Sequence, residues 1–257
     1  MPFTLAHPAA VLPLRRFRFL QTVPLIIGSM VPDAHYFLPE RWQRYFLVAT
    51  HTFEGTFTLC LPMGMAALLM ILLLRDPLTV LLPGRIRWVC LHSLERFSAP
   101  PMHWPIAVLS ILVGSWTHLA WDSFTHPGGW LTERVTALRE TVSIFGWQTE
   151  MSHLLQYVSS IAGLTVLGIW FARLWARAPG PASFASWPVS HRVLVGAIVA
   201  GSVGFGLLHS LYALYAGSYY RMLFILLTRS IRWSVLLLLL AGMVVVLSRR
   251  PALQTVR

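Results

Sequence analysis

Long apolar runs separated by short polar connectors dominate the chain. A helix needs about 20 mainly apolar residues to cross a bilayer. Five runs approach this length, and the last and shortest is extended across the interface by residues 223–227; the runs are 57–74, 104–121, 154–175, 193–215 and 234–247. The connectors contain proline and glycine pairs, which are typical of turns. The pattern predicts an all-α fold, a polytopic membrane helical bundle with about five spanning helices.

A sixth apolar run, residues 19–31, is too short to span comfortably, and Pro24 interrupts it. We expect a short N-terminal helical hairpin instead, with its first helix starting near His7 and Pro8. A hairpin brings His7 and Asp33 to the same side of the membrane, whereas a span would separate them. The whole chain, 1–257, is predicted to be a single integral membrane domain. Residues 1–150 carry the candidate site, and residues 151–257 add further spanning helices.

Composition agrees with a membrane protein. The chain is 56% hydrophobic and 11% charged, whereas soluble domains carry about 25% charged residues. Its net charge of +11 comes from arginine alone. These arginines flank the apolar runs, which indicates anchoring at the membrane edge rather than binding to nucleic acid. No nucleic-acid motif is present, so the lipid bilayer is the expected partner. Cys60 and Cys90 lie in different segments, and we expect no disulfide. The N-terminus lacks the pattern of a signal peptide.

Candidate chemistry lies in two motifs that contain two of the three aspartates. The first is Pro32-Asp33-Ala34-His35, and the second runs from His118 through Asp122 to His126. A carboxylate next to a bilayer is expensive and indicates function. Residues four apart share a helix face, and imidazole with carboxylate is a typical ligand set for zinc-like ions.

Topology places these motifs together. Two consecutive spanning helices are antiparallel, so His51, before the first span, and Asp122, after the second, share one side of the membrane. No span separates Asp33 from His51, so Asp33 lies there too. A divalent metal, with zinc expected, is therefore predicted, and the candidates suffice for two ions bridged by an aspartate; they are His7, Asp33, His35, His51, His118, Asp122 and His126.

Three further residues are candidates for catalysis or substrate binding. Glu54 follows His51 by three residues and is a candidate general base or an orienting group for a ligand. Arg134 and Arg139 are candidate phosphate contacts. All of these candidates, the metal ligands included, also have a purely structural interpretation. Histidines at helix ends act as interfacial caps, Asp33 fits an N-cap, Glu54 fits a polar helix start, and the arginines fit a solvated surface.

Three stretches of the sequence resemble a bacterial membrane family known only as domain of unknown function 4184. They are the opening Met1-Pro2-Phe3-Thr4 through Ala10, the segment from Gly28 to Asp33, and the segment from Trp116 to Trp130. The stretch Leu155 to Ser160 is also similar to it. This resemblance implies no activity.

A more distant resemblance concerns inner-membrane proteins known as metal-dependent hydrolases of the zinc-dependent phospholipase C type. The matching positions are His7, Asp33, Thr50-His51-Thr52, His118 and Asp122. Two positions depart from that pattern: Ala34 stands where a second aspartate is expected, and Leu47-Val48 replaces a His-Arg pair. One metal of a multi-metal centre is then missing or held differently.

These observations favour a metal-dependent hydrolase in the bacterial inner membrane that acts on a phosphoester, with a phospholipid head group as the expected substrate. The alternatives are a metal or proton carrier and a structural envelope component. The side of the membrane is open. Arginine-rich connectors indicate that the site faces outward. Five arginines argue the reverse if the N-terminal hairpin does not span and leaves them on the site side; they are Arg15, Arg16, Arg18, Arg41 and Arg44.

Overall fold

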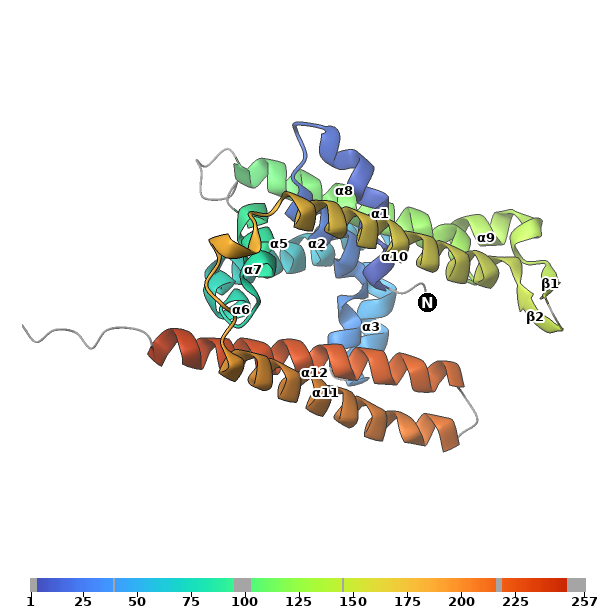
Figure 1. Ribbon diagram of the computed structural model, residues 1–257. Helices are drawn as coiled ribbons and strands as arrows, with labels where there is room; N and C mark the ends of the chain where they lie inside the picture. Colours follow the sequence, from blue (N-terminus) through green and yellow to red (C-terminus); the bar gives the residue numbers. More distant parts are fainter. Residues whose placement is uncertain (1–3, 39, 95–102, 145, 216–218, 249–257) are drawn as a thin grey trace, which may run out of the picture. The chain divides into compact units, whose positions relative to one another are not determined.

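The computed structural model describes residues 4–38, 40–94, 103–144, 146–215 and 219–248, and these are helical apart from one pair of strands (Figure 1). The elements in chain order are η1 Thr4–Ala6, α1 Pro8–Val11, η2 Leu12–Arg16, α2 Thr22–Met30, η3 Val31–Phe37, α3 Glu40–Thr50, α4 Phe53–Gly55, η4 Thr56–Cys60, α5 Leu61–Leu73, α6 Arg75–Thr79, α7 Gly84–Leu94, α8 His103–Thr125, α9 Trp130–Arg134, η6 Thr136–Leu138, β1 Thr141–Ile144, β2 Trp147–Glu150, α10 Met151–Arg177, η7 Pro181–Ser183, α11 Val189–Tyr215 and α12 Tyr219–Ser248.

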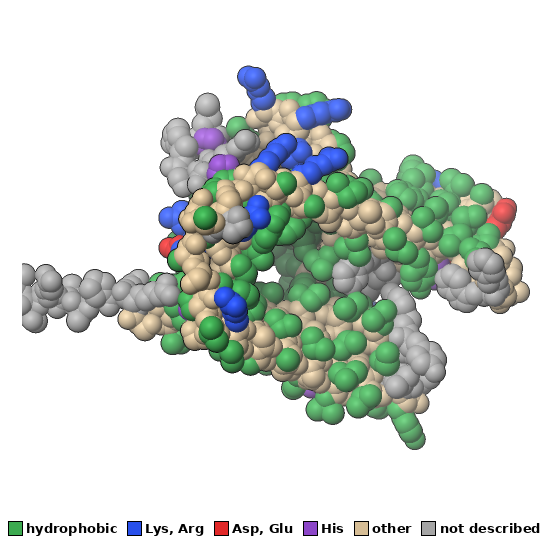
Figure 2. All heavy atoms as spheres, viewed as in Figure 1, with side chains coloured by type: hydrophobic (Ala, Val, Ile, Leu, Met, Phe, Trp, Pro, Cys, Tyr) green, Lys and Arg blue, Asp and Glu red, His purple; other side chains and the backbone are tan. Residues whose placement is uncertain are grey.

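The predicted all-α membrane fold is confirmed. Within the described residues, five helical segments are long and apolar enough to cross a membrane: Phe53–Leu73, His103–Arg134, Met151–Arg177, Val189–Tyr212 and Arg221–Ser248. Residues 223–227 and 234–247 belong to one continuous helix, as predicted. Large hydrophobic side chains such as Leu208 and Val244 are exposed on α11 and α12, where they suit contact with lipid (Figure 2).

The described helices divide into two compact units. Unit 1 comprises Met1–Met70 and Ser93–Arg177, and unit 2 comprises Ile71–His92 and Ala178–Arg257. All seven metal-ligand candidates belong to unit 1. Cys60 lies in unit 1 and Cys90 in unit 2, and both are free thiols. That the chain forms a single integral domain stays a prediction.

The N-terminal hairpin of unit 1 packs against α8. Its second arm, α2, runs parallel to α8, since successive contacts advance along both helices. The backbone N–H of Gln21 donates to Ser110 Oγ at 2.9 Å, Ser115 Oγ donates to the Gly28 carbonyl at 3.1 Å, and His118 Nδ1 donates to the Ser29 carbonyl at 2.8 Å. Both ends of the hairpin therefore lie beside His118 of α8.

Two glycines allow this contact. A Cβ atom at Gly28 would overlap the backbone carbonyl of Ile111, and one at Gly114 would overlap the carbonyl of Leu25. Backbones that approach this closely leave no room for a side chain. The pair of glycines thus sets the depth at which the hairpin sits on α8, and with it the position of the Ser29 carbonyl beside His118.

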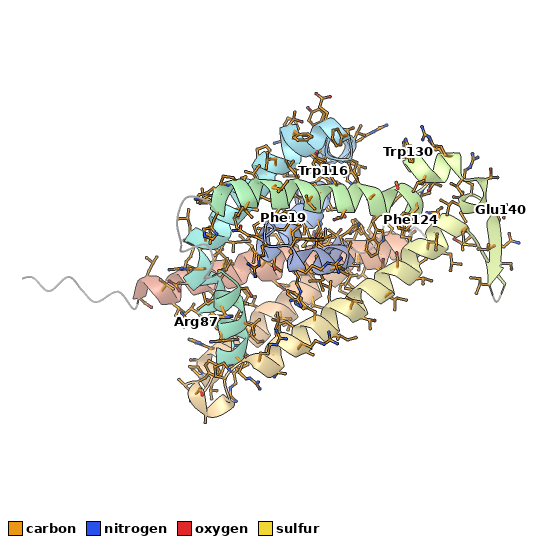
Figure 3. All side chains as sticks on the ribbon, turned by 90° about the horizontal axis from the view of Figure 1, so that it is seen from above. Phe19, Arg87, Trp116, Phe124, Trp130 and Glu140 are labelled. Atoms are coloured by element: carbon orange, nitrogen blue, oxygen red, sulfur yellow. The ribbon has the colours of Figure 1, made fainter. Side chains whose placement is uncertain are left out.

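The tip of the hairpin points away from the candidate ligands. Gln21, just after the tip, also contacts His103 Nδ1 at 3.0 Å, at the first residue of α8. Figure 3 shows Phe19 beside the first half of α8 and Phe124 near its other end. Basic side chains gather over this turn (Figure 2), where Arg15, Arg16 and Arg18 are exposed. A non-spanning hairpin therefore does not leave these arginines at the site.

The rest of unit 1 surrounds the same end of α8. Thr50 Oγ1, at the end of α3, donates to the Pro32 carbonyl at 2.8 Å. Thr52 caps the first spanning segment by accepting from the Gly55 N–H at 2.9 Å, and the turn that follows, η4, is a π-helix. On the other flank, Trp121 Nε1 of α8 donates to Ser159 Oγ of α10 at 3.1 Å. Such hydrogen bonds stabilise the association of helices in lipid.

An antiparallel pair of strands, β1 and β2, was not predicted. The pair joins Thr141 to Glu150 and Ile144 to Trp147, and Gly146 between the strands has φ +82°. The available sequence signal was the β-branched residues before a glycine able to adopt positive φ. Figure 3 places Glu140, next to this hairpin, beyond the end of α8.

Unit 2 is built on the antiparallel pair α11 and α12. Gly206 of α11 lies against Ser230 and the Leu226 carbonyl of α12, and the rings of Phe205 and Trp233 meet edge to face at 5.3 Å. Small residues at such a crossing let two helices approach closely in lipid. The Trp187 indole, before α11, donates to the Leu81 carbonyl at 3.0 Å, which ties the loop after α6 to this pair.

We predict that Gly28→Ala destabilises the protein by about 1–3 kcal/mol, the usual range for overpacking a tight contact. The matched control is Gly168→Ala, because a Cβ there meets no atom within 4 Å. Alanine in that helix is neutral or stabilising by up to about 1 kcal/mol. Thermal unfolding in detergent measures both. Equal stability of the two variants would contradict the tight α2–α8 contact.

Candidate metal centre

The structure brings the His and Asp motifs together at one end of α8. His7 immediately precedes α1, and Asp33 and His35 lie in η3. His51 follows α3, and His118 and Asp122 occupy one face of α8. Five of the predicted ligands lie close together, namely His7, Asp33, His51, His118 and Asp122, and their ligand atoms form two overlapping groups. That they share one side of the membrane stays a prediction.

The Asp122 carboxylate is the centre of the cluster. Its Oδ1 lies 3.1 Å from His7 Nε2 and 3.4 Å from His126 Nδ1. Its Oδ2 lies 3.2 Å from His118 Nε2 and 3.6 Å from His51 Nε2. The side chain is 13% exposed. Each carboxylate oxygen therefore serves a different pair of imidazoles, as a bridging carboxylate would.

The Asp33 carboxylate closes the cluster on the other side. Its Oδ1 lies 3.6 Å from His51 Nε2 and 3.8 Å from His118 Nε2. Its Oδ2 accepts a hydrogen bond from Thr4 Oγ1 at 2.5 Å. The hydroxyl of Thr4 thus fixes the carboxylate so that Oδ1 faces the two imidazoles.

The protonation of three rings follows from their backbone contacts. His7 Nδ1 lies 3.3 Å from the Thr4 carbonyl, His51 Nδ1 lies 2.8 Å from the Leu47 carbonyl, and His118 Nδ1 lies 2.8 Å from the Ser29 carbonyl. A carbonyl oxygen only accepts, so each Nδ1 carries a proton. In a neutral ring, Nε2 then holds a lone pair. All three Nε2 atoms face carboxylate oxygens.

Nitrogen lone pairs cannot face carboxylate oxygens this closely without a proton or a metal ion between them. Protons on all three Nε2 atoms would create adjacent imidazolium rings, yet His7 and His118 stack with ring centroids 3.9 Å apart and would repel each other. His118 Nε2 is buried, and its 3.2 Å contact with Asp122 Oδ2 does not have the geometry of a hydrogen bond. Neutral imidazoles held through Nδ1, with ionised carboxylates opposite, are the usual ligand arrangement of a metal site.

The spacing fits a small divalent ion. Within the described residues, two groups have ligand atoms that all lie within 4.8 Å of one another: His7 with His118 and Asp122, and Asp33 with His51 and His118. Two ligands bound tetrahedrally at about 2.0 Å from zinc lie about 3.3 Å apart. The contacts to Asp122 span this value. Because His118 Nε2 has one lone pair, it binds to one ion at a time.

Two of the predicted ligands stand beside this set rather than in it. The Gln156 amide nitrogen lies 3.2 Å from His126 Nε2, and a proton donated there leaves the His126 proton on Nδ1, toward Asp122. In this arrangement His126 orients the carboxylate. His35 donates from Nδ1 to the Pro32 carbonyl at 3.0 Å, and its buried Nε2 has no described partner. Ligation by His35 and His126 stays a prediction.

Charges outside the spanning segments are strongly perturbed. Burial would raise the pKa of the Asp33 carboxyl, but the nearby His118 ring and the His51 hydrogen bond outweigh burial and hold that pKa well below its usual range. Burial would lower the pKa of His51, whereas its hydrogen bonds to Asp122 and Asp33 raise it to about 9. Without a bound ion His51 therefore carries a proton on Nε2, which a metal ion would displace on binding. Burial, with the adjacent His118, lowers the pKa of His7. Asp33 is therefore ionised at neutral pH, the form that binds a cation.

The other three predicted residues do not meet the cluster. Glu54 is exposed in α4, and none of its described contacts involves a candidate ligand. The Arg134 guanidinium lies 4.3 Å from the centroid of the Trp130 ring and donates to the Trp130 carbonyl at 2.9 Å. Arg139 is exposed after η6. Their roles as base and phosphate contacts stay predictions.

Sequence reasoning missed the groups that position the ligands. Thr4 gave no signal, because a threonine near an N-terminus is unremarkable until Asp33 is known to fold back onto it. The carbonyls of Leu47 and Ser29 are invisible in a sequence. One spacing did carry information: Leu47 precedes His51 by four residues, which places its carbonyl within reach of the His51 ring on a helix.

A family model, "Domain of unknown function (DUF4184)", matches residues 1–247. The chain belongs to this family. The proposed resemblance to it is thereby confirmed. No curated protein and no solved structure matches the chain. The candidate metal centre therefore rests on the geometry of this member's own residues.

We predict that the purified protein contains a divalent metal and that His118→Ala combined with Asp122→Ala abolishes it. His118 belongs to both groups of candidate ligands and Asp122 to one of them, so neither group survives intact. Elemental analysis of the membrane-extracted protein measures the metal content. The matched control is His209→Ala, whose ring is exposed and donates to the Phe205 carbonyl at 3.1 Å. Unchanged metal in the double variant would rule out this centre.

Proposed function

We propose that this protein is a metal-dependent hydrolase of the bacterial inner membrane that acts on a phosphoester, with a phospholipid head group as substrate. The observation that carries the proposal is the set of three imidazole Nε2 atoms facing two carboxylates. Each of these rings has its Nδ1 committed to a backbone carbonyl. Zinc is the expected ion, because imidazole with carboxylate is among its preferred ligand sets.

A divalent ion bound here would supply Lewis acidity, which polarises a phosphoryl oxygen and activates water at neutral pH. The chain's own residues divide the remaining work. His7 and His118 are almost fully buried and form the floor of the site. His51 and Asp122 are 22% and 13% exposed, so they form its accessible face. Asp122 links the two pairs of imidazole rings, since each of its oxygens faces a different pair.

The location of the cluster supports a site for a substrate of the lipid interface. The candidate ligands sit where the first spanning segment begins and toward the end of α8. The adjacent helix α3 exposes Trp42, Tyr45 and Val48 together with Arg41 and Arg44. Aromatic and basic residues of this kind favour the head-group level of a membrane. A phosphoester at that level would lie within reach of the accessible face.

The same location argues against a carrier. A transport path needs titratable or polar groups at successive depths of the bilayer. Among the described residues, the clustered His and Asp side chains all lie at one end of α8, and the other end presents His103 and Gln21 bonded to each other. A site at one edge suits chemistry on a substrate that arrives from that edge.

We predict that the purified protein releases head groups from one member of a phospholipid panel and that a chelator stops the release. Asp122→Asn should lower the rate about 100-fold or more, because the amide removes the charge shared by four rings. Asp33→Asn should cost less, since Asp33 faces only two rings. Mass spectrometry of the released head groups gives the rates.

The matched control for both changes is Asp76→Asn, which replaces the third aspartate, half-exposed in α6. Its rate should equal that of the unmodified protein. A fully metal-loaded protein that turns over no phosphoester would contradict the hydrolase while leaving the metal centre intact. Flux of the metal into liposomes would then support the carrier.

We further propose that the site opens away from the cytoplasm. Within unit 1, the end remote from the site carries Arg15, Arg16 and Arg18 at the hairpin tip, and Arg173 and Arg177 at the end of α10. The site end carries fewer exposed arginines, which are Arg41, Arg44, Arg134 and Arg139. Excess arginine marks the cytoplasmic side. The arginine-rich connectors before α8 and after α10 favour the same orientation.

Labelling with a membrane-impermeant thiol reagent tests this orientation. In a protein with Cys60 and Cys90 replaced, Thr52→Cys and Thr136→Cys should react in right-side-out vesicles, since both positions are exposed near the site. Ala176→Cys, exposed beside Arg177, should react only after the vesicles are opened. The reverse pattern would place the site on the cytoplasmic face. Reaction of Thr52→Cys and Thr136→Cys from opposite sides would contradict the shared face itself.

A further inference from the structure

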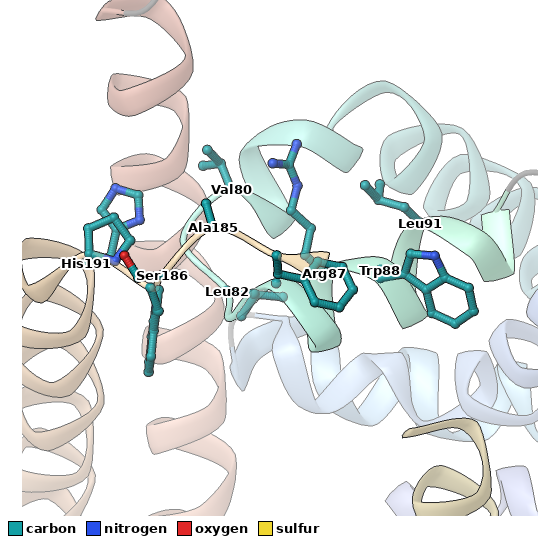
Figure 4. Close-up of a pocket in the computed structure, with 12 residues that line it drawn as sticks. Val80, Leu82, Arg87, Trp88, Leu91, Ala185, Ser186 and His191 are labelled. Carbon is teal, nitrogen blue, oxygen red and sulfur yellow. The ribbon is translucent and has the colours of Figure 1, made fainter. Parts of the chain in front are cut away.

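Unit 2 contains a pocket of about 410 Å³. One wall is α7 with the loop before it, including Arg87 and Trp88, and the other is the segment that leads into α11, including Phe184, Trp187 and His191 (Figure 4). All of the lining residues belong to the described part of unit 2, and none of them is acidic. The pocket is therefore a mixed aromatic and basic surface.

Contacts on both walls hold the pocket in shape. The Trp187 indole donates to the Leu81 carbonyl at 3.0 Å, and Arg192 Nε donates to the Trp187 carbonyl at 2.9 Å. Gly84, at the start of α7, lies so close to Phe184 that a Cβ would stand 2.7 Å from the Phe184 Cβ. The two walls are thus tied together without a ligand, and little ordering is needed on binding.

The basic groups of the pocket are available to an anion. Arg87 Nη2 lies 3.6 Å from Asp76 Oδ1, a long contact between side chains that are 38% and 57% exposed. Such a surface pair is weak. Arg87 Nε is buried and has no hydrogen-bond partner in the described structure. His191 and the Ser186 hydroxyl lie on the opposite wall (Figure 4), so donors come from both sides.

The pocket lies at the level of the membrane surface. The fourth spanning segment begins at Val189, and the pocket is lined by the residues just before it and by His191 in its first turn. Trp88 and Trp187 suit that level, because tryptophan favours the interface between lipid and water. A ligand there meets water on one side and acyl chains on the other.

We propose that this pocket binds the phosphate head group of an anionic phospholipid. Arg87 and His191 contact the phosphate, and the rings of Trp88, Phe184 and Trp187 pack against the glycerol and the first methylenes of the acyl chains. Basic pockets between membrane helices recognise anionic head groups in this way. The site is separate in sequence from the metal centre and does not depend on the hydrolytic activity.

Tryptophan fluorescence of the full chain in detergent, titrated with phosphatidylglycerol, measures this binding. Arg87→Gln should weaken it about tenfold or more, the effect of losing one charge-assisted hydrogen bond. Arg87→Lys should retain part of it. The matched control is Arg173→Gln, an exposed arginine at the end of α10, which should bind as the unmodified protein does. Helical content by circular dichroism confirms that each variant is folded.

Titrations with two further ligands distinguish a phospholipid from a soluble phosphate as the occupant of the pocket. Phosphatidylcholine should bind at least about tenfold more weakly, because its head group carries no net charge, and inorganic phosphate should not compete at millimolar concentration. Equal binding of phosphatidylcholine would overturn the charge recognition. Displacement of the lipid by inorganic phosphate would overturn the lipid as occupant and indicate a soluble anion. Folded Arg87→Gln with unchanged affinity would overturn the pocket itself.

Discussion

The carboxylate of Asp122 faces four imidazole rings at 3.1 to 3.6 Å, and the architecture of unit 1 can be understood as the means of assembling them. An ionised carboxylate beside a bilayer is costly unless charge is supplied opposite it. His118 lies in α8 and His126 directly after it, but His7 and His51 come from distant segments. The N-terminal hairpin and the start of the first spanning segment must therefore both reach this one oxygen pair.

The scaffold fixes those rings through the backbone rather than through other side chains. The Ser29 carbonyl that orients His118 is placed by the tight contact of α2 on α8, which depends on Gly28 and Gly114. The Leu47 carbonyl that orients His51 belongs to α3, whose end is tied to Pro32 by Thr50. The contacts that pack these helices are consequently the same contacts that orient the ligands. A change that loosens α2 from α8 would reach the metal centre without touching a ligand.

The sequence predicted the helices and most of the cluster because both follow from simple spacing. Apolar length defines the spans, a four-residue interval pairs His118 with Asp122, and antiparallel spans bring His51 to the same end. The hairpin also followed from length, since residues 19–31 are too few to span. These inferences need no knowledge of side-chain packing.

What the sequence did not show was the direction in which an element runs. The tip of the hairpin was expected on the site side, but α2 is parallel to α8 and sends Arg15, Arg16 and Arg18 the other way. Arg134 was a candidate phosphate contact. The chain turns after α8 at Gly128, which has φ +76°, and the guanidinium lies over Trp130, so that role stays a prediction. A sequence gives the order of residues along a turn but not the angle at which the next helix leaves it.

The two units differ in the kind of polar group that they bury, and this difference locates the chemistry. In the described part of unit 1, the buried polar side chains include imidazoles, a carboxylate and the Gln156 amide, whereas those of unit 2 are hydroxyls, namely Thr79, Ser202, Ser210 and Ser230. Hydroxyls can bond to carbonyls of their own helix, as Thr79 and Ser210 do, and so create no demand for a cation. Carboxylates and imidazoles gathered this closely need a proton or a metal ion between them. Unit 2 therefore suits lipid packing, and within the described residues the candidate metal ligands all belong to unit 1.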